Sequence, residues 1–167
     1  MTSSAQQVVE VSVEIVVQPP LRVGVSRWLI PPVVARTSNP GLVQEFADNR
    51  KHVYATAMLT SSDGEDYSTI LNGNWNVNAN LVADSGGSGS GGGSSSRHAR
   101  NRWLYFVFHP VSIGLGGTFS FSVVVSALSL ESNSCMVVGG RSTRQFTVVN
   151  QPVPPEKPRM NDTFCAT

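Results

Sequence analysis

Few residues in this sequence have the types and spacings that catalysis or metal binding requires. The three histidines, His52, His98 and His109, show no metal-ligand spacing, and neither Cys135 nor Cys165 accompanies one at zinc-finger distance. The chain contains no Gly-x-Ser-x-Gly motif, and no nucleophile stands beside a base. We therefore expect a protein that is not an enzyme and that uses no metal, cofactor or small-molecule substrate.

Two short clusters resemble ligand-binding motifs but predict turns. Asp63, Glu65 and Asp66 fall in a predicted hairpin turn, where solvated carboxylates are normal, and the run offers too few oxygen ligands for calcium. The glycines of residues 114–117 lack the Lys-Ser/Thr pair of a phosphate-binding loop and lead into a strand. A tight turn is the expectation for them.

Arginines are the remaining candidates for a functional surface. Arg97, Arg100 and Arg102 form a basic cluster that leads into Trp103 and Tyr105. Arginines beside aromatic rings suit contact with phosphates and stacking on bases. The same cluster also suits a solubilising cap on a hydrophobic strand, and the sequence leaves both interpretations open.

A second, sparser set consists of Arg22, Arg27 and Arg36, around a proline-rich segment. These residues are either phosphate contacts or scattered surface arginines. Together the two sets make up the six candidate DNA-contacting residues, which are Arg22, Arg27, Arg36, Arg97, Arg100 and Arg102.

Composition limits the partners that this chain can have. Charged residues make up 14% of the 167 residues, against about 25% in a typical domain, and the net charge is +1. These values exclude a highly charged disordered tail and a strongly basic nucleic-acid binder. Two cysteines are too few for a disulfide framework, and Cys135, in an apolar run, is expected to be buried. With no signal-peptide pattern and no apolar run of about 20 residues, we expect an intracellular protein without a membrane segment.

Apolar residues mostly alternate with polar ones or form short β-branched runs, which predicts strands. The predicted strands span residues 8–17, 30–35, 53–60, 103–108, 118–125, 135–138 and 145–149. Residues 67–71 are expected to pair back on 53–60, and Gly139 with Gly140 is expected to form a hairpin turn. The one helix candidate is 40–49, which Asn39 would cap. The pattern predicts an all-β, antiparallel sandwich with at most one or two short helices.

The chain reads as one domain over residues 1–155, followed by an extended tail at 156–167. A Gly/Ser stretch at 85–96 has no side chains to pack, so it is expected to be a flexible loop inserted in the domain. Its composition fits a natural insertion and an engineered replacement equally well.

Several short motifs follow one another along the chain. Residues 15–24 carry Ile-Val-Val-Gln-Pro-Pro-Leu-Arg-Val-Gly, and residues 30–34 carry Ile-Pro-Pro-Val-Val. Further along are Leu-x-Gly at 71–73, Tyr-Phe-Val-Phe at 105–108, Val-Ser-Ile at 111–113, Gly-x-Phe at 117–119 and Ser-x-x-Gln-Phe-Thr-Val at 142–148. In this order the chain resembles the velvet domain of fungal developmental regulators.

The resemblance implies an immunoglobulin-like β-sandwich of the Rel-homology type. It also implies a nuclear transcription regulator, with shuttling to the cytoplasm, that controls sporulation and secondary metabolism. Such a protein binds double-stranded DNA and forms homodimers, or heterodimers with another velvet-domain protein. By this resemblance, Arg22 and Arg27 stand where the family carries its DNA-contacting basic stretch.

The chain departs from the family pattern at several basic positions. Neutral residues occupy them here, namely Ala83, Gly114, Ser120 and Ser122. Two hypotheses follow: a DNA-binding regulator, or an interaction subunit with little or no DNA affinity that pairs with another velvet protein. The second would use exposed apolar residues such as Trp28 and Leu29, although Trp28 is equally expected in the core. Convergence of the arginines on one face would favour the first hypothesis.

Overall fold

The computed structural model describes residues 10–83 and 101–154, where β-strand is the predominant secondary structure. The strands are β1 (Glu14–Val17), β2 (Arg22–Gly24), β3 (Val33–Thr37), β4 (Lys51–Ser61), β5 (Leu71–Gly73), β6 (Asn76–Asn78), β7 (Asn80–Ala83), β8 (Arg102–Phe108), β9 (Val111–Ile113), β10 (Gly117–Ser129) and β11 (Cys135–Val149). Helix α1 (Pro40–Ala47) and a 3₁₀ turn at Ser68–Ile70 complete the described elements. The predicted all-β class is confirmed. No helix in the described part is long and apolar enough to cross a membrane.

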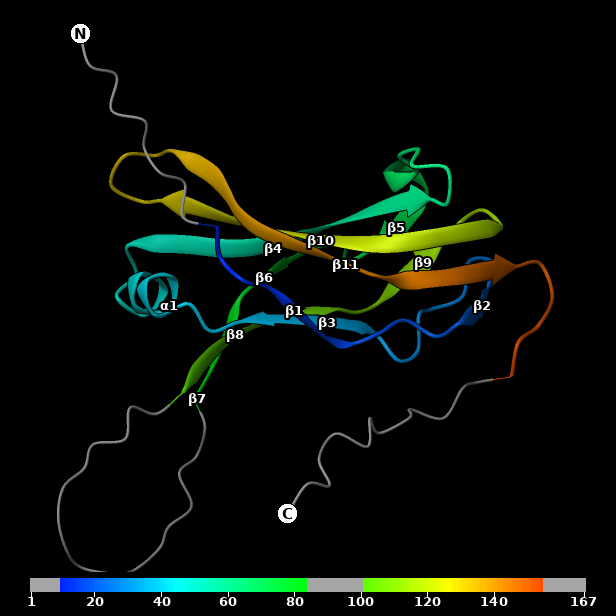
Figure 1. Cartoon of the computed structure of the whole chain (residues 1–167), viewed down its shortest axis with the longest axis horizontal. Coiled ribbons are helices and arrows are strands. Elements are labelled where there is room, and N and C mark those ends of the chain that lie inside the picture. The colour runs from blue at the N-terminus through cyan, green and yellow to red at the C-terminus, as the bar shows by residue number, and fades with distance from the viewer. Residues whose placement is uncertain (1–9, 84–100, 155–167) are drawn as a thin grey trace, which may run out of the picture.

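The strands form two main sheets that face each other (Figure 1). One sheet has the order β1-β3-β8-β7, the other has the order β2-β11-β10-β4-β6, and β5 pairs with β9 in a short third sheet. All strand pairs are antiparallel except β2 with β11, which run parallel. Because β2 joins the end of β11, it brings residues near the N-terminus of the domain beside residues near its C-terminus.

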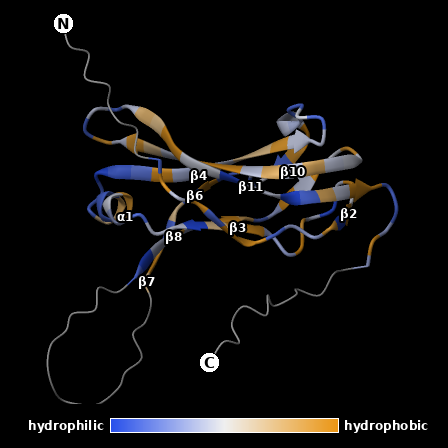
Figure 2. Ribbon diagram, viewed as in Figure 1, coloured by the Kyte–Doolittle hydropathy of each residue, from blue (hydrophilic) through white to orange (hydrophobic). Residues whose placement is uncertain are grey.

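The core lies between the two main sheets. Phe108 of β8 packs edge-on against Phe121 of β10, with ring centroids 5.3 Å apart. Phe119, Phe121 and Val123 are all buried on one face of β10, as the alternating pattern predicts. Hydrophobic segments recur along the strands of both layers (Figure 2). Interdigitated aromatic and branched side chains thus hold the sheets together by removing apolar surface from water.

Helix α1 confirms a prediction that rests on local signals alone. The Asn39 side chain accepts a hydrogen bond from Leu42 N at 3.0 Å, and Pro40 occupies the first turn. These two residues satisfy or remove amide donors that the start of a helix leaves without partners. Leu42 and Val43 are buried, so the helix packs on the domain through one face.

The predicted hairpin at Gly139 and Gly140 is wrong, because β11 runs unbroken from Cys135 to Val149 along β10. The two glycines make room for other backbone instead. A Cβ atom on Gly139 would overlap the carbonyl oxygen of Val11, and one on Gly140 would lie 2.9 Å from Val123 O. The real hairpin joins β10 to β11 through residues 130–134.

The predicted return of residues 67–71 onto β4 is also wrong beyond its first residue. Tyr67 N donates to Leu59 O at 2.7 Å, but the chain then turns into the 3₁₀ segment, and β5 pairs with β9. The Asp66 side chain causes this turn, since it accepts from both the backbone N–H and the hydroxyl of Ser68.

The N-terminal strand is shorter than the predicted 8–17. Residues 8 and 9 lie outside the described part, and β1 begins at Glu14. The predicted alternation still holds, because Val11 and Val13 are buried whereas Ser12 and Glu14 are exposed. Val11 N donates to Val138 O at 2.7 Å, so this segment crosses from the β11 side to the opposite sheet.

Cys135 is exposed, contrary to the expectation of a buried thiol. It begins β11 on the outer face, where its sulfur lies 3.1 Å from the hydroxyl of Tyr54. The hydrogen bond with Cys135, with burial second, raises the pKa of Tyr54 above its ordinary value. An apolar run predicts burial only where its strand is covered, and residues 135–137 are all exposed, so both faces of β11 are open to solvent at its start.

Candidate functional site

The four candidate arginines in the described part of the chain do not converge on one face. Arg22 and Arg27 belong to β2 and the turn after it, at one end of the molecule (Figure 1). Arg102 begins β8 at the opposite end, beside β7 and α1. Arg97 and Arg100 lie outside the described residues. The described candidates therefore do not form a single broad cationic surface.

Arg36 is engaged within the outer face of its own sheet. Its Nε donates to a carboxylate oxygen of Glu14 at 2.9 Å, and its Nη1 donates to the hydroxyl of Tyr105 at 3.1 Å. The guanidinium carbon lies 3.8 Å from the centroid of the Trp103 ring. Burial opposes the charge, but the hydrogen bonds to Tyr105 and Glu14 outweigh it and raise the pKa of Arg36. A phosphate would have to displace these partners.

Arg102 also has a partner. Its Nη2 donates to Gln44 Oε1 at 2.6 Å, which ties the start of β8 to helix α1. The side chain is half-buried rather than projecting into solvent. This contact suits a structural role at the helix–sheet junction.

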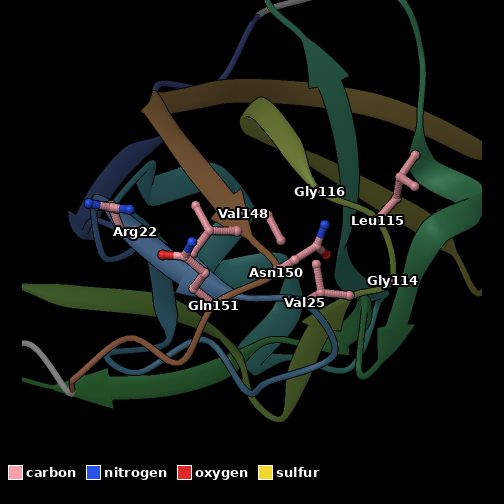
Figure 3. A pocket seen from close by; sticks show the side chains of 9 residues that line it. Arg22, Val25, Gly114, Leu115, Gly116, Val148, Asn150 and Gln151 are labelled. Atoms are coloured by element: carbon pink, nitrogen blue, oxygen red, sulfur yellow. The ribbon is translucent and has the colours of Figure 1, made fainter.

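Arg22 and Arg27 share a groove, which we call the β2 groove. It has a volume of about 570 Å³. Its lining comprises Pro20, Arg22, Val23, Gly24, Val25, Arg27, Trp28, Ile30, Val149, Asn150, Gln151, Pro152, Val153 and Pro154. A second hollow of about 560 Å³ adjoins it and adds residues 114–116. In Figure 3, Arg22 stands at one rim of that hollow and Leu115 at the other, with Asn150 and Val25 between them.

The turn after β2 fixes the position of Arg27. Val25 N donates to Val149 O at 2.9 Å, and Arg27 N closes the turn by donating to Gly24 O at 3.1 Å. Ser26 sits at φ 60, a left-handed conformation that residues other than glycine rarely adopt. A Cβ on Gly24 would lie 3.0 Å from Cγ of Arg27, so the glycine lets the arginine stem lie against the backbone.

The following residues present an apolar rim. Leu29 is 1% exposed, and its N–H donates to Val111 O at 2.8 Å, so it anchors the loop in the core. Its neighbours point outward, since Trp28 is 50% exposed and Ile30 is 55% exposed. The expectation that Leu29 is exposed is thus wrong, and the open question on Trp28 is decided in favour of the surface. A bridge between Trp28 and Ser112 holds this segment to β9.

Sequence reasoning missed two residues of this region. Leu115, 50% exposed, comes from the predicted tight turn and lines the adjoining hollow. Arg144 lies in β11, where its Nη2 donates to Pro19 O at 3.1 Å and its N–H donates to Gln18 Oε1. It thereby holds the segment that enters the groove. Its position just before a predicted strand was the only signal in the sequence.

The remaining candidates are spread over the surface. In the described part, no group of three or more His, Cys, Asp or Glu side chains could hold a metal ion. Asp63 and Glu65 are exposed in the turn after β4, and hydrogen bonds from Ser68 lower the pKa of the neighbouring Asp66 carboxyl. No model of a known protein family matches the chain, and no curated protein matches it.

Proposed function

We propose that this chain is a velvet-like regulatory domain that acts as a protein-interaction subunit, with the β2 groove as its docking surface. Its partner would be another velvet-domain protein or a second copy of the chain. The setting would be the nucleus, in the control of sporulation and secondary metabolism, as the ordered motifs of the sequence imply.

The composition of the groove rim carries this proposal. Two arginines stand beside exposed Trp28 and Ile30, with Leu115 next to them. Aromatic residues and arginine are enriched at the centres of protein interfaces, where a few such side chains supply most of the binding energy. Exposed apolar side chains that gather in one patch with polar groups at its rim mark interaction sites, whereas scattered ones do not.

The proposal is tested by measuring mass in solution, alone and with a velvet-domain partner, by analytical ultracentrifugation. We expect a complex that Trp28→Ala weakens by about 30-fold or more in dissociation constant, the loss typical of an interface hot spot. The matched control is Trp75→Ala, because Trp75 is 46% exposed and lies outside the groove lining. A chain that stays monomeric and ignores every velvet partner would refute the proposal.

A second candidate function is DNA-binding transcription regulation through Arg22 and Arg27. It is favoured by one observation, that the described residues of the groove lining include two cations and no carboxylate. Two phosphate contacts give a slope of log affinity against log salt of about −1.8. Titration of duplex DNA at several salt concentrations tests this. Affinity absent at low salt, or unchanged in a double Arg22→Ala, Arg27→Ala variant, would rule it out.

A further inference from the structure

We infer that the β2 groove recognises an acidic segment of the partner protein, in which an apolar side chain is flanked by carboxylates. The apolar side chain would pack on Trp28 and Ile30, and the carboxylates would meet Arg22 and Arg27. This inference rests on the proposed function and specifies the chemistry of the partner at that surface.

The first step of the argument concerns charge. The ion pairs within the described residues are Arg36 with Glu14 and Lys51 with Glu45. Within the described residues, neither Arg22 nor Arg27 has a carboxylate within salt-bridge distance, and none of the described residues that line their groove is acidic. These two guanidinium groups are therefore available to an incoming carboxylate, which they can bind in a bidentate manner.

The second step concerns the apolar rim. Trp28 and Ile30 are each at least half exposed, follow Arg27 closely in the sequence and line the same groove as the two arginines. An occupant that carried only negative charge would leave both side chains in water. A segment with an apolar residue between its carboxylates would cover them, which distinguishes a peptide from the uniformly anionic backbone of duplex DNA.

The third step concerns preorganisation. The loop that carries Trp28 is held by the buried Leu29 and by hydrogen bonds from Ser26 N to Ile113 O and from Leu29 N to Val111 O, each at 2.8 Å. Ser26 keeps its left-handed backbone within this frame. Strained backbone of this kind persists where the surroundings over-determine it and is concentrated at binding sites. A surface already in its bound shape loses little entropy on binding.

The test uses the full chain and three fluorescent synthetic peptides, followed by anisotropy. The first peptide places Leu-Phe between two pairs of Asp and Glu, the second replaces the acids by lysine, and the third replaces Leu-Phe by Ser-Ser. We expect the first to bind and each of the others to lose about tenfold or more in affinity, because each lacks one half of the recognition. Equal binding of all three would overturn the inference.

Variants assign the binding to the groove. A double Arg22→Ala, Arg27→Ala change and a Trp28→Ala change should each weaken the acidic peptide by about tenfold or more. The controls Arg141→Ala and Trp75→Ala replace exposed residues outside the lining and should leave its affinity within about twofold. A double Arg22→Glu, Arg27→Glu variant should prefer the lysine peptide. If the variant remains folded by circular dichroism and loses the acidic peptide without gaining the lysine peptide, the inference is overturned.

The outcomes separate this inference from the proposed function. If Trp28→Ala disrupts the complex with a velvet partner while the three peptides bind alike, the groove is an interaction surface but the acidic recognition is refuted. If no partner binds but the acidic peptide does, the inference stands and the velvet partnership is refuted. A short DNA duplex that displaces the peptide at physiological salt would assign the groove to DNA and overturn the inference.

Discussion

Replacing Gly139 by alanine puts a methyl group where the backbone of another segment already lies. The new Cβ would overlap the carbonyl oxygen of Val11, lie 3.2 Å from its carbonyl carbon, and lie 3.3 Å from a methyl group of Val13. Two of the three obstacles are backbone atoms, so no side-chain rotation relieves the overlap. The segment that contains Val11 has to move away from β11.

The magnitude follows from what that movement breaks. The hydrogen bond from Val11 N to Val138 O, 2.7 Å long, contributes about 0.5–1.5 kcal/mol. Val11 and Val13 are both buried, and each valine loses about 1.5–3 kcal/mol if it becomes fully exposed. With the hydrogen bond lost and the valines partly exposed, Gly139→Ala should lower the free energy of unfolding by about 2–4 kcal/mol.

Urea unfolding followed by tryptophan fluorescence measures this, with two matched glycine controls. Gly64→Ala introduces a side chain at φ +85 with no atom within 4 Å, so only backbone strain of about 1 kcal/mol is expected. Gly41→Ala lies in α1 with only Asn39 Oδ1 nearby, at 3.5 Å, and should stabilise by about 0.5 kcal/mol. If Gly139→Ala costs no more than Gly64→Ala, the glycine is not there for close backbone approach and the account of β11 is wrong.

Leu29→Ala is expected to cost about 3 kcal/mol in urea unfolding because Leu29 is fully buried, whereas Trp28→Ala should change stability by under about 0.5 kcal/mol. Equal losses would contradict the anchor role. Ser68→Ala should raise the pKa of Asp66, because it removes the hydroxyl whose hydrogen bond is the main cause of the lowered value, while the backbone N–H stays. The stability that Asp66 contributes is present above its ordinary pKa and is lost as the pH falls through the lowered folded-state pKa. An unchanged NMR titration midpoint would contradict this. Asn39→Ala removes the cap of α1 and should cost about 1 kcal/mol, with Asn39→Asp as the tolerated control in thermal melts.

The alternation of β10 and the cap of α1 were predictable because their causes are local. Every second residue of a strand faces the same side, so the positions of Phe119 and Phe121 in the sequence already place them together. Asn39 and Leu42 are three residues apart, and their hydrogen bond needs nothing from the rest of the chain. The alternation of β10 and the cap of α1 could therefore be predicted from short-range geometry alone.

The site was predictable only in part. The residue types pointed to arginines. The four candidates in the described part differ in their side-chain partners and in their location, which the sequence does not reveal. Arg36 is occupied because antiparallel register sets it opposite Glu14 on one strand and Tyr105 on another. Among the described residues Arg22 has no ion-pair partner, because β2 pairs with β11, far along the chain, and none of the described residues that line the groove is acidic. Pairings across such distances leave no local pattern.

By itself, the sequence determined the all-β class, the capped helix and the scarcity of groups that could do chemistry. Periodicity and capping depend on residues close together in the sequence, and composition is a count over the chain, so all three can be read without knowledge of the fold. The tertiary structure decided which of the described arginines have side-chain partners, which apolar residues face solvent and why Gly139 is a glycine. Each of those outcomes depends on a second segment far along the chain, since only folding brings Glu14 to Arg36 and Val11 to Gly139.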